Sequence, residues 1–254
     1  MPTTTACTRT GRMTWAMGRH SAKPTCFVEQ DPGASLLRRA AAEAIGTFML
    51  MLVVAGSAAR AHDLGHVAPA FASSVGAVAV SGSLVGLILA FGAVSGGHFN
   101  PLITMLQWLG KERSLRCTAV YLVAQVAGAL SACILARMVF DAPLAAAAPP
   151  TLSSALDEAV ASAGLMMIVL GCSRSGRSAT GPFAVGAWLA GAIVAVPSLF
   201  YANPALAIAA NLTSRDIDRF FAETVLAVAM EVLGGLAAFV AIRLTFPRAD
   251  QVSP

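Results

Sequence analysis

The sequence predicts an all-α membrane protein made of two inverted halves, with six membrane-spanning helices and two short half-helices. Apolar residues make up 57% of the chain and charged residues only 12%, whereas soluble proteins carry about 25% charged residues. An Asn-Pro pair occurs twice, at Asn100-Pro101 and Asn203-Pro204, and each pair opens a short apolar run. Each half contains three predicted spans, an odd number, so the second half must enter the membrane with the opposite orientation.

The first half, residues 38–140, contains three predicted spans and one half-helix. The spans cover about residues 40 to 59, 67 to 94 and 117 to 134. Asn is a preferred N-cap and Pro suits the first helical position, so Asn100-Pro101 predicts a helix start. The apolar run that follows ends at Leu109 and is about 12 Å long, less than half of a hydrocarbon core of about 30 Å. This run is therefore predicted to be a re-entrant half-helix.

The second half, residues 155–245, repeats this pattern after a predicted outer loop at 141–156. Its spans are predicted at about 159 to 172, 181 to 200 and 221 to 242, with the second half-helix after Asn203. The sequence around Glu43 resembles that around Glu158, and the sequence around Gln125 resembles that around Glu231. In an inverted repeat the two half-helices enter from opposite faces and meet near the midplane.

The ends of the chain are predicted to be cytoplasmic tails, a disordered one at 1–37 and a short one at 246–254. The first is polar and lacks the apolar core of a signal peptide. If it is cytoplasmic, 13 of the 17 Lys and Arg residues fall in inner segments, which agrees with the positive-inside rule. The basic residues therefore report topology, and no nucleic-acid partner is expected.

Metal and cofactor sites are not expected from the cysteines. The chain has five, an odd number, without a CxxC pair or a Cys/His spacing typical of metal ligands. Cys117, Cys133 and Cys172 fall in or at the ends of apolar spans, where cysteine behaves as a small buried hydrophobe.

The two Asn-Pro pairs predict chemistry at the point where the half-helices meet. Each Asn side-chain oxygen can cap its own half-helix, which leaves the NH₂ donors to face a lumen. Each helix N-terminus also carries roughly +0.5 charge. Donors and positive ends at one point favour the oxygen of a neutral solute and oppose cations and hydronium. Passive flux of small uncharged molecules is the expected activity.

These motifs resemble those of the aquaporin, or major intrinsic protein, family over about residues 38–245. The run from Ser95 to Thr104 is close to one family motif, and the Asn-Pro-Ala sequence at 203–205 matches the other. The resemblance implies an aquaporin-like fold in the lipid bilayer, a pore in every protomer and a homotetramer. The pore residues that it implies are Asn100, Pro101, Leu102, Asn203, Pro204 and Ala205, with Leu102 where Ala is usual.

Selectivity is where the sequence departs from the common pattern. The resemblance assigns the outer filter to Val80 or Ser81, Gly191, Phe200 and Leu206, and Leu206 stands where the family usually has Arg. A filter without this Arg is expected to be wider and more apolar than that of a strict water channel, and its exclusion of cations is left open. Gly191 with Phe200 resembles glycerol facilitators. An aliphatic residue at 206 resembles a bacterial subgroup that includes channels for arsenous acid and other neutral metalloid hydroxides, which implies a bacterial inner membrane.

Polar residues around the pore motifs are expected to support them. The resemblance implies that Glu43 and Glu158 accept hydrogen bonds from the two re-entrant loops. It also implies that His98 lines the pore through its backbone, an interpretation favoured over a proton-sensing role. Glu231 matches Gln125 in the repeat and is interpreted as a polar partner across helices in preference to a titrating gate.

Two other classes of protein remain as alternatives. A secondary transporter can also use inverted repeats and broken helices, but no carboxylate cluster accompanies Asn100 and Asn203. An intramembrane enzyme would need a nucleophile and a base. Ser95 with His98 is the only near pair, and it lacks a GxSxG context. A channel without enzymatic activity is therefore favoured.

Overall fold

A computed structural model of the chain describes residues 27–31, 33–65, 69–140, 151–196, 200–212 and 217–246. Every regular element within these residues is a helix, which confirms the predicted all-α class. Most of the predicted tails, at 1–26 and 247–254, lies outside the described residues. The helices are α1 (Leu36–Gly65), α2 (Pro69–Ser95), α3 (Pro101–Leu109), α4 (Leu115–Phe140), α5 (Leu152–Arg174), α6 (Gly181–Ala195), α7 (Pro204–Leu212) and α8 (Ile217–Thr245).

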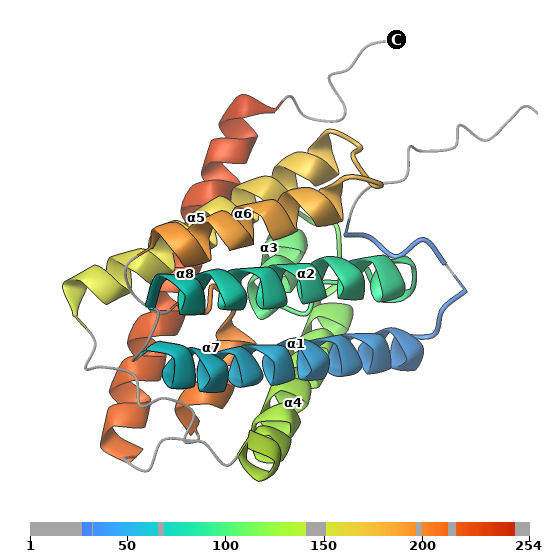
Figure 1. Cartoon of the computed structure of the whole chain (residues 1–254). Coiled ribbons are helices and arrows are strands. Elements are labelled where there is room, and N and C mark those ends of the chain that lie inside the picture. Colours follow the sequence, from blue (N-terminus) through green and yellow to red (C-terminus); the bar gives the residue numbers. More distant parts are fainter. Residues whose placement is uncertain are drawn as a thin grey trace, which may run out of the picture.

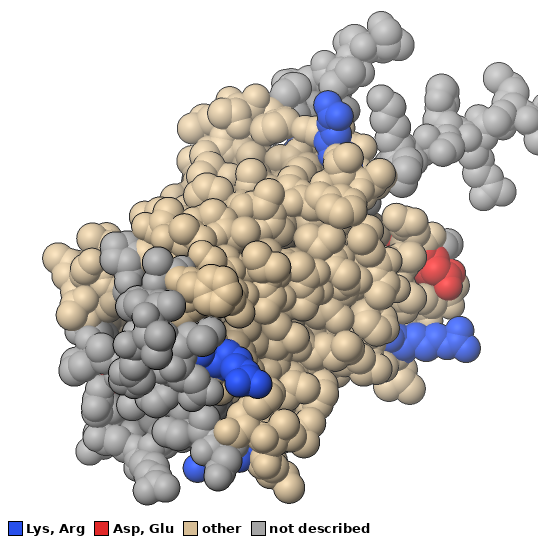
Figure 2. Space-filling view, viewed as in Figure 1, with Lys and Arg blue, Asp and Glu red and all other residues tan. Residues whose placement is uncertain are grey.

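Five of these helices, α1, α2, α4, α5 and α8, are long and apolar enough to cross a membrane. The fifth predicted span, 181–200, corresponds to α6, which has 15 residues and is about 22 Å long; residues 197–199, at the end of that prediction, lie outside the described part. Large apolar side chains project outward from the long helices, and Val78, Val123 and Val225 are 74%, 70% and 65% exposed. Figure 2 shows a broad area of uncharged described residues, with a few charged side chains around it. Such a surface suits contact with lipid.

The two predicted half-helices are α3 and α7, each nine residues long. Both begin at the proline of an Asn-Pro pair, as the capping argument predicts, and both lie among the longer helices (Figure 1). Asn100 has an extended backbone, with φ −150° and ψ 118°, and its side chain accepts a hydrogen bond from Leu102 N. An extended N-cap residue followed by Pro ends the irregular loop and starts the helix at a defined point.

The inverted repeat is visible in how the long helices cross. α1 packs against α4, and α5 packs against α8. At the first crossing a Cβ added to Gly128 would overlap the carbonyl of Ala44, and at the second a Cβ on Gly234 would overlap the carbonyl of Ala159. Glycine is needed at both places because the helix backbones touch. The same contact in both halves gives the two crossings the same geometry.

The segment before α1 is ordered from Phe27 to Asp31, so the prediction of a disordered tail up to residue 37 is wrong there. Phe27 is only 4% exposed. The backbone N–H groups of Gln30 and Asp31 donate to Ala93 O at 2.9 and 3.3 Å. An apolar side chain in the core and paired backbone groups offset the entropy of ordering this segment. α1 then begins at Leu36, before the predicted start at residue 40.

The helix that opens the second half also starts earlier than predicted. Thr151 caps α5 by accepting a hydrogen bond from Ser154 N, and the Ser154 side chain accepts one from Thr151 N. This reciprocal capping satisfies N–H groups that would otherwise be unpaired at the helix start. Residues 152–156 are therefore helical, although the sequence assigned them to the outer loop.

Candidate functional site

The site is built on two asparagines that cap the half-helices and reach across to the opposite loop. Asn100 Oδ1 accepts from Leu102 N at 2.8 Å, and Asn203 Oδ1 accepts from Ala205 N at 3.1 Å. Asn100 Nδ2 donates to Ala202 O and Asn203 Nδ2 donates to Phe99 O, both at 2.8 Å. Each amide group has two N–H bonds, so one from each Asn fastens the halves together and one remains for a solute.

The residue before each Asn has the same unusual backbone. Phe99 and Ala202 both have φ 48°, a left-handed conformation that residues with a side chain rarely adopt. It turns each carbonyl toward the opposite Asn, where it accepts the bond just described. The two loops are therefore strained in the same way and require support from their surroundings.

Glu43 supplies this support in the first half. Its Oε1 accepts from Ser95 Oγ at 2.6 Å and from His98 N at 3.0 Å. Its Oε2 accepts from Phe99 N and from Gln125 Nε2, both at 2.7 Å. Four donors around one buried carboxylate satisfy all its acceptor sites, so the loop backbone is fixed at His98 and Phe99.

Two carboxyl groups share this task in the second half. Glu158 accepts from Tyr201 N on Oε1 and from Ala202 N on Oε2, both at 3.0 Å. Glu231 Oε1 accepts from Asn203 N at 2.7 Å. The sequence predicted Glu158 as a support but assigned Glu231 only to contact between helices. Its direct bond to the pore asparagine was missed.

The ring of His98 is held by the segment before α1. Its Nε2 donates to Phe27 O at 2.9 Å, because a carbonyl oxygen can only accept, and its Nδ1 lies 2.8 Å from Thr104 Oγ1. Gln107 Nε2 also donates to Phe27 O, at 2.7 Å. Ser95 donates instead to Glu43. The Ser95 and His98 side chains are thus engaged with separate partners, not arranged as a nucleophile and its base.

Charged residues hold the ordered segment 27–31 in place, on the side of the membrane that the predicted topology assigns to the cytoplasm. Glu29 forms ion pairs with Arg39 and with Arg113, the latter at 2.8 Å. The Arg113 guanidinium also stacks over the ring of Tyr121 with 4.6 Å between them. Tyr121 in turn donates to Ser95 O at 2.9 Å. None of these links was predicted, because the residues are far apart in the sequence and form no motif.

A third ion pair joins the loop after α3 to the end of α5. Arg174 Nη2 lies 3.4 Å from Glu112 Oε1, and both side chains are about one quarter exposed, at 26% and 29%. Burial raises the pKa of Glu112, although Arg174 and Arg113 act in the opposite direction. The attraction therefore does not compensate for the partial loss of water around this carboxylate.

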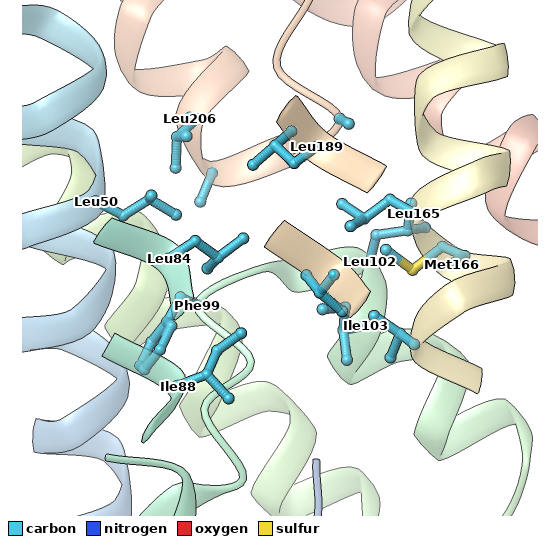
Figure 3. Close-up of a cluster of buried hydrophobic side chains, with 14 of the residues drawn as sticks. Leu50, Leu84, Ile88, Phe99, Leu102, Ile103, Leu165, Met166, Leu189 and Leu206 are labelled. Atoms are coloured by element: carbon cyan, nitrogen blue, oxygen red, sulfur yellow. The ribbon is translucent and has the colours of Figure 1, made fainter. Parts of the chain in front are cut away.

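Residues next to both asparagines belong to one buried cluster of apolar side chains. Leu84, Leu189 and Leu206 point toward one another from α2, α6 and α7 (Figure 3). Leu206 is 3% exposed and Phe200 packs against the same cluster. Two of the predicted filter positions, Phe200 and Leu206, therefore contact one cluster.

The remaining predicted filter residues lie on α2 and α6. Val80 packs against the cluster, while Ser81 is buried and its hydroxyl donates to Ala77 O. Gly191 is exposed, and a Cβ added there would meet no atom within 4 Å. Among the described residues there is also no group of three or more His, Cys, Asp or Glu side chains that could hold a metal ion.

Comparison with known proteins gives the same assignment as the fold. The family model described as major intrinsic protein matches residues 30–241. The chain is 35% identical over 182 residues to aquaglyceroporin AqpS of Rhizobium meliloti. The matched residues cover 70% of this chain and 77% of that protein. It is 33% identical over 97 residues to aquaporin Z of Photorhabdus laumondii, over 38% of this chain and 41% of that one.

A solved structure shares the fold. The X-ray structure of the aquaglyceroporin from Plasmodium falciparum superposes with a TM-score of 0.61 at 18% identity, covering 82% of this chain and 95% of that one. At this identity the likeness concerns the fold alone. The match of the family model over most of the chain goes further, and this chain belongs to the major intrinsic protein family.

Proposed function

We propose that this protein is a passive membrane channel for water and small neutral solutes. The observation that carries the proposal is the pair of asparagines, each of which caps one half-helix and donates to the loop of the other. The remaining N–H of each amide group can bind the oxygen of a passing solute. Direct hydrogen bonds join each Asn to the loop of the other half, so the two loops cannot move apart freely. A passive pore fits this arrangement better than a coupled transporter.

Charge at the crossing point supports the choice of neutral solutes. Two helix N-termini meet there, and each carries roughly +0.5 charge. A cation or hydronium ion would meet this field without a compensating carboxylate, since Glu43 and the carboxyl groups of the second half point their oxygens at backbone N–H groups. A neutral hydroxyl-bearing molecule meets only donors and apolar walls.

Leu206 sets the class of solute. An apolar residue three positions after Asn203 supplies neither a fixed cation nor hydrogen-bond donors, and Gly191 adds no side chain. We propose a filter formed by Val80 or Ser81 with these residues and Phe200, wide enough for glycerol-like polyols and for neutral metalloid hydroxides such as arsenous acid. The relative from Rhizobium meliloti bears the name aquaglyceroporin, which supports this choice over water alone.

The setting we propose is the inner membrane of a bacterium, with both termini in the cytoplasm. The distribution of Lys and Arg supports this orientation, and a rhizobial relative supports a bacterial origin. The channel domain covers about 38–245, with halves at 38–140 and 155–245, and it assembles as a homotetramer without enzymatic activity. Exposed apolar side chains on the long helices provide surface for contacts with lipid and with neighbouring protomers.

Stopped-flow light scattering on proteoliposomes tests the proposal. Osmotic water, glycerol and arsenous acid permeabilities are compared for the native protein and for Leu206→Arg. The Arg variant is expected to retain water flux and to lose most of the flux of the larger solutes, because the added guanidinium narrows the filter and supplies donors for water.

Leu206→Met is the matched control, since it adds length without charge. It is expected to behave like the native protein toward all three solutes. If the native protein does not exceed empty liposomes for any neutral solute, the channel assignment fails. If it conducts water alone and the Arg variant changes nothing, the role of Leu206 in solute choice is wrong.

A further inference from the structure

The supports of the two pore loops differ at one position, where Glu231 takes the place of Gln125. Each residue lies three positions before the glycine that touches the opposite helix, Gly234 or Gly128. Gly128 touches the carbonyl of Ala44, and Gly234 touches that of Ala159. Glu43 and Glu158 are the residues directly before these two alanines. Since the two crossings have the same geometry, the side chains at 158 and 231 face each other as those at 43 and 125 do.

An amide and a carboxylate meet in the first half. Gln125 Nε2 donates to Glu43 Oε2 at 2.7 Å. In the second half the residue at this place is Glu231, whose Oε1 accepts from Asn203 N and whose other oxygen is Oε2. This oxygen is buried, and it has no hydrogen-bond partner among the described residues. Glu231 as a whole is 0% exposed and Glu158 is 5% exposed, so bulk water has little access to the pair.

Among the described residues, no Lys or Arg side chain lies near these two carboxyl groups. The ionisable residues nearest to them on the elements packed around them are Asp157 on α5, Tyr201 in the loop before α7 and Glu223 on α8, while α3, α6 and α7 carry no ionisable residue. The described cations on α5 and α8 are Arg174 and Arg243, about 24 Å and 18 Å away along their helices. Two buried carboxylates side by side would repel each other strongly.

We propose that Glu158 and Glu231 hold one proton between them, so that an O–H···O hydrogen bond replaces the amide bond of the first half. The proton gives the unpartnered Oε2 of Glu231 a bond to Glu158. The pair, with a single negative charge, then accepts from three consecutive backbone N–H groups, those of Tyr201, Ala202 and Asn203. Glu231 is thus a positioning residue, which acts on a solute through Asn203.

This proton makes the second pore loop sensitive to alkaline pH, an extension that depends on the proposed channel function. Loss of the proton would place two charges in contact and push Glu231 away from Asn203 N. The strained backbone at Ala202 would then lose part of its support. The first loop has no such dependence, because the amide of Gln125 cannot release its proton in this range.

Infrared difference spectroscopy of the reconstituted protein tests the proposal without a transport measurement. A protonated carboxyl group has a C=O stretch that is separate from carboxylate bands and shifts in D₂O. At neutral pH, Glu231→Gln and Glu158→Gln are each expected to remove the same single band, because either amide can donate to the remaining carboxylate. If neither substitution removes such a band, the shared proton does not exist and the proposal is overturned.

The first half offers a matched control, Gln125→Glu, which recreates the pair beside Glu43. This variant is expected to add a second carboxyl band. Water permeability gives the second readout: in the native protein it should fall several-fold between about pH 6 and about pH 10, and in Glu231→Gln it should stay constant. A band that is lost with no change in the pH profile would refute the coupling to the pore while leaving the channel function intact.

Discussion

The unequal supports of the two loops predict that one substitution, Glu to Gln, has different effects at equivalent positions. In Glu43→Gln only one oxygen remains to accept, and the new NH₂ group faces two of the four donors that the carboxylate satisfied. Each buried donor left without a partner costs about 1–3 kcal/mol, so the variant loses about 2–6 kcal/mol of stability by this principle.

Glu158→Gln removes an acceptor from only one of two donors, a loss of about 1–3 kcal/mol. Its new N–H can also donate to the unpartnered oxygen of Glu231, which offsets part of this loss. The melting temperature of Glu43→Gln is therefore expected to fall by roughly 10 °C and that of Glu158→Gln by less than half as much.

Thermal unfolding in detergent, followed by size-exclusion chromatography of the heated samples, measures both variants under the same conditions. Water permeability of the same preparations reports whether the loops stay in place, and the order of the two losses should be the same. A fall for Glu158→Gln that equals or exceeds the fall for Glu43→Gln would refute the inference that the first loop depends on a full set of four donors.

Two further predictions concern residues outside the asparagine pair. Gly128→Ala places a methyl group on the carbonyl of Ala44, so the crossing of α1 and α4 must widen; folded yield is expected to drop, whereas Gly86→Ala, with no atom within 4 Å, should be neutral. Glu29→Gln leaves the buried guanidinium of Arg113, 4% exposed, without its carboxylate, and the weaker hydrogen bonding is expected to lower the free energy of unfolding by about 1–3 kcal/mol in thermal unfolding. The surface pair of Glu112 serves as its control, because Glu112→Gln should change stability by less than about 1 kcal/mol.

The parts of the site that follow local rules could be predicted from the sequence. The cap at Asn100 and the helix start at Pro101 depend on residues next to each other, and both were found by their motif. The positions of Glu43 and Glu158 came from the repeat together with the family resemblance. The sequence could not reveal that each Asn donates to the carbonyl before the other, because this bond requires the left-handed backbone at Phe99 and Ala202.

The ordered segment before α1 shows a second limit. Phe27 is one aromatic residue in a polar stretch, and no periodic pattern marks it as buried. Its role becomes visible only when His98 and Gln107, far along the chain, are seen to donate to its carbonyl. A contact of this kind depends on the tertiary fold rather than on local propensity. The polar composition that suggested disorder describes the residues around Phe27 and not the one that is buried.

The supports differ between the halves in a way that bears on selectivity. The first loop is fixed by four donors on Glu43 and by the segment at Phe27, so it has little freedom to change. The second loop depends on two carboxyl groups and three backbone N–H groups. Leu206, at the position where the resemblance leads us to expect Arg, lies three residues after Asn203. The residue proposed to set solute choice and the pair proposed to respond to protons therefore lie on the same side of the pore. The loop on that side is held by fewer hydrogen bonds.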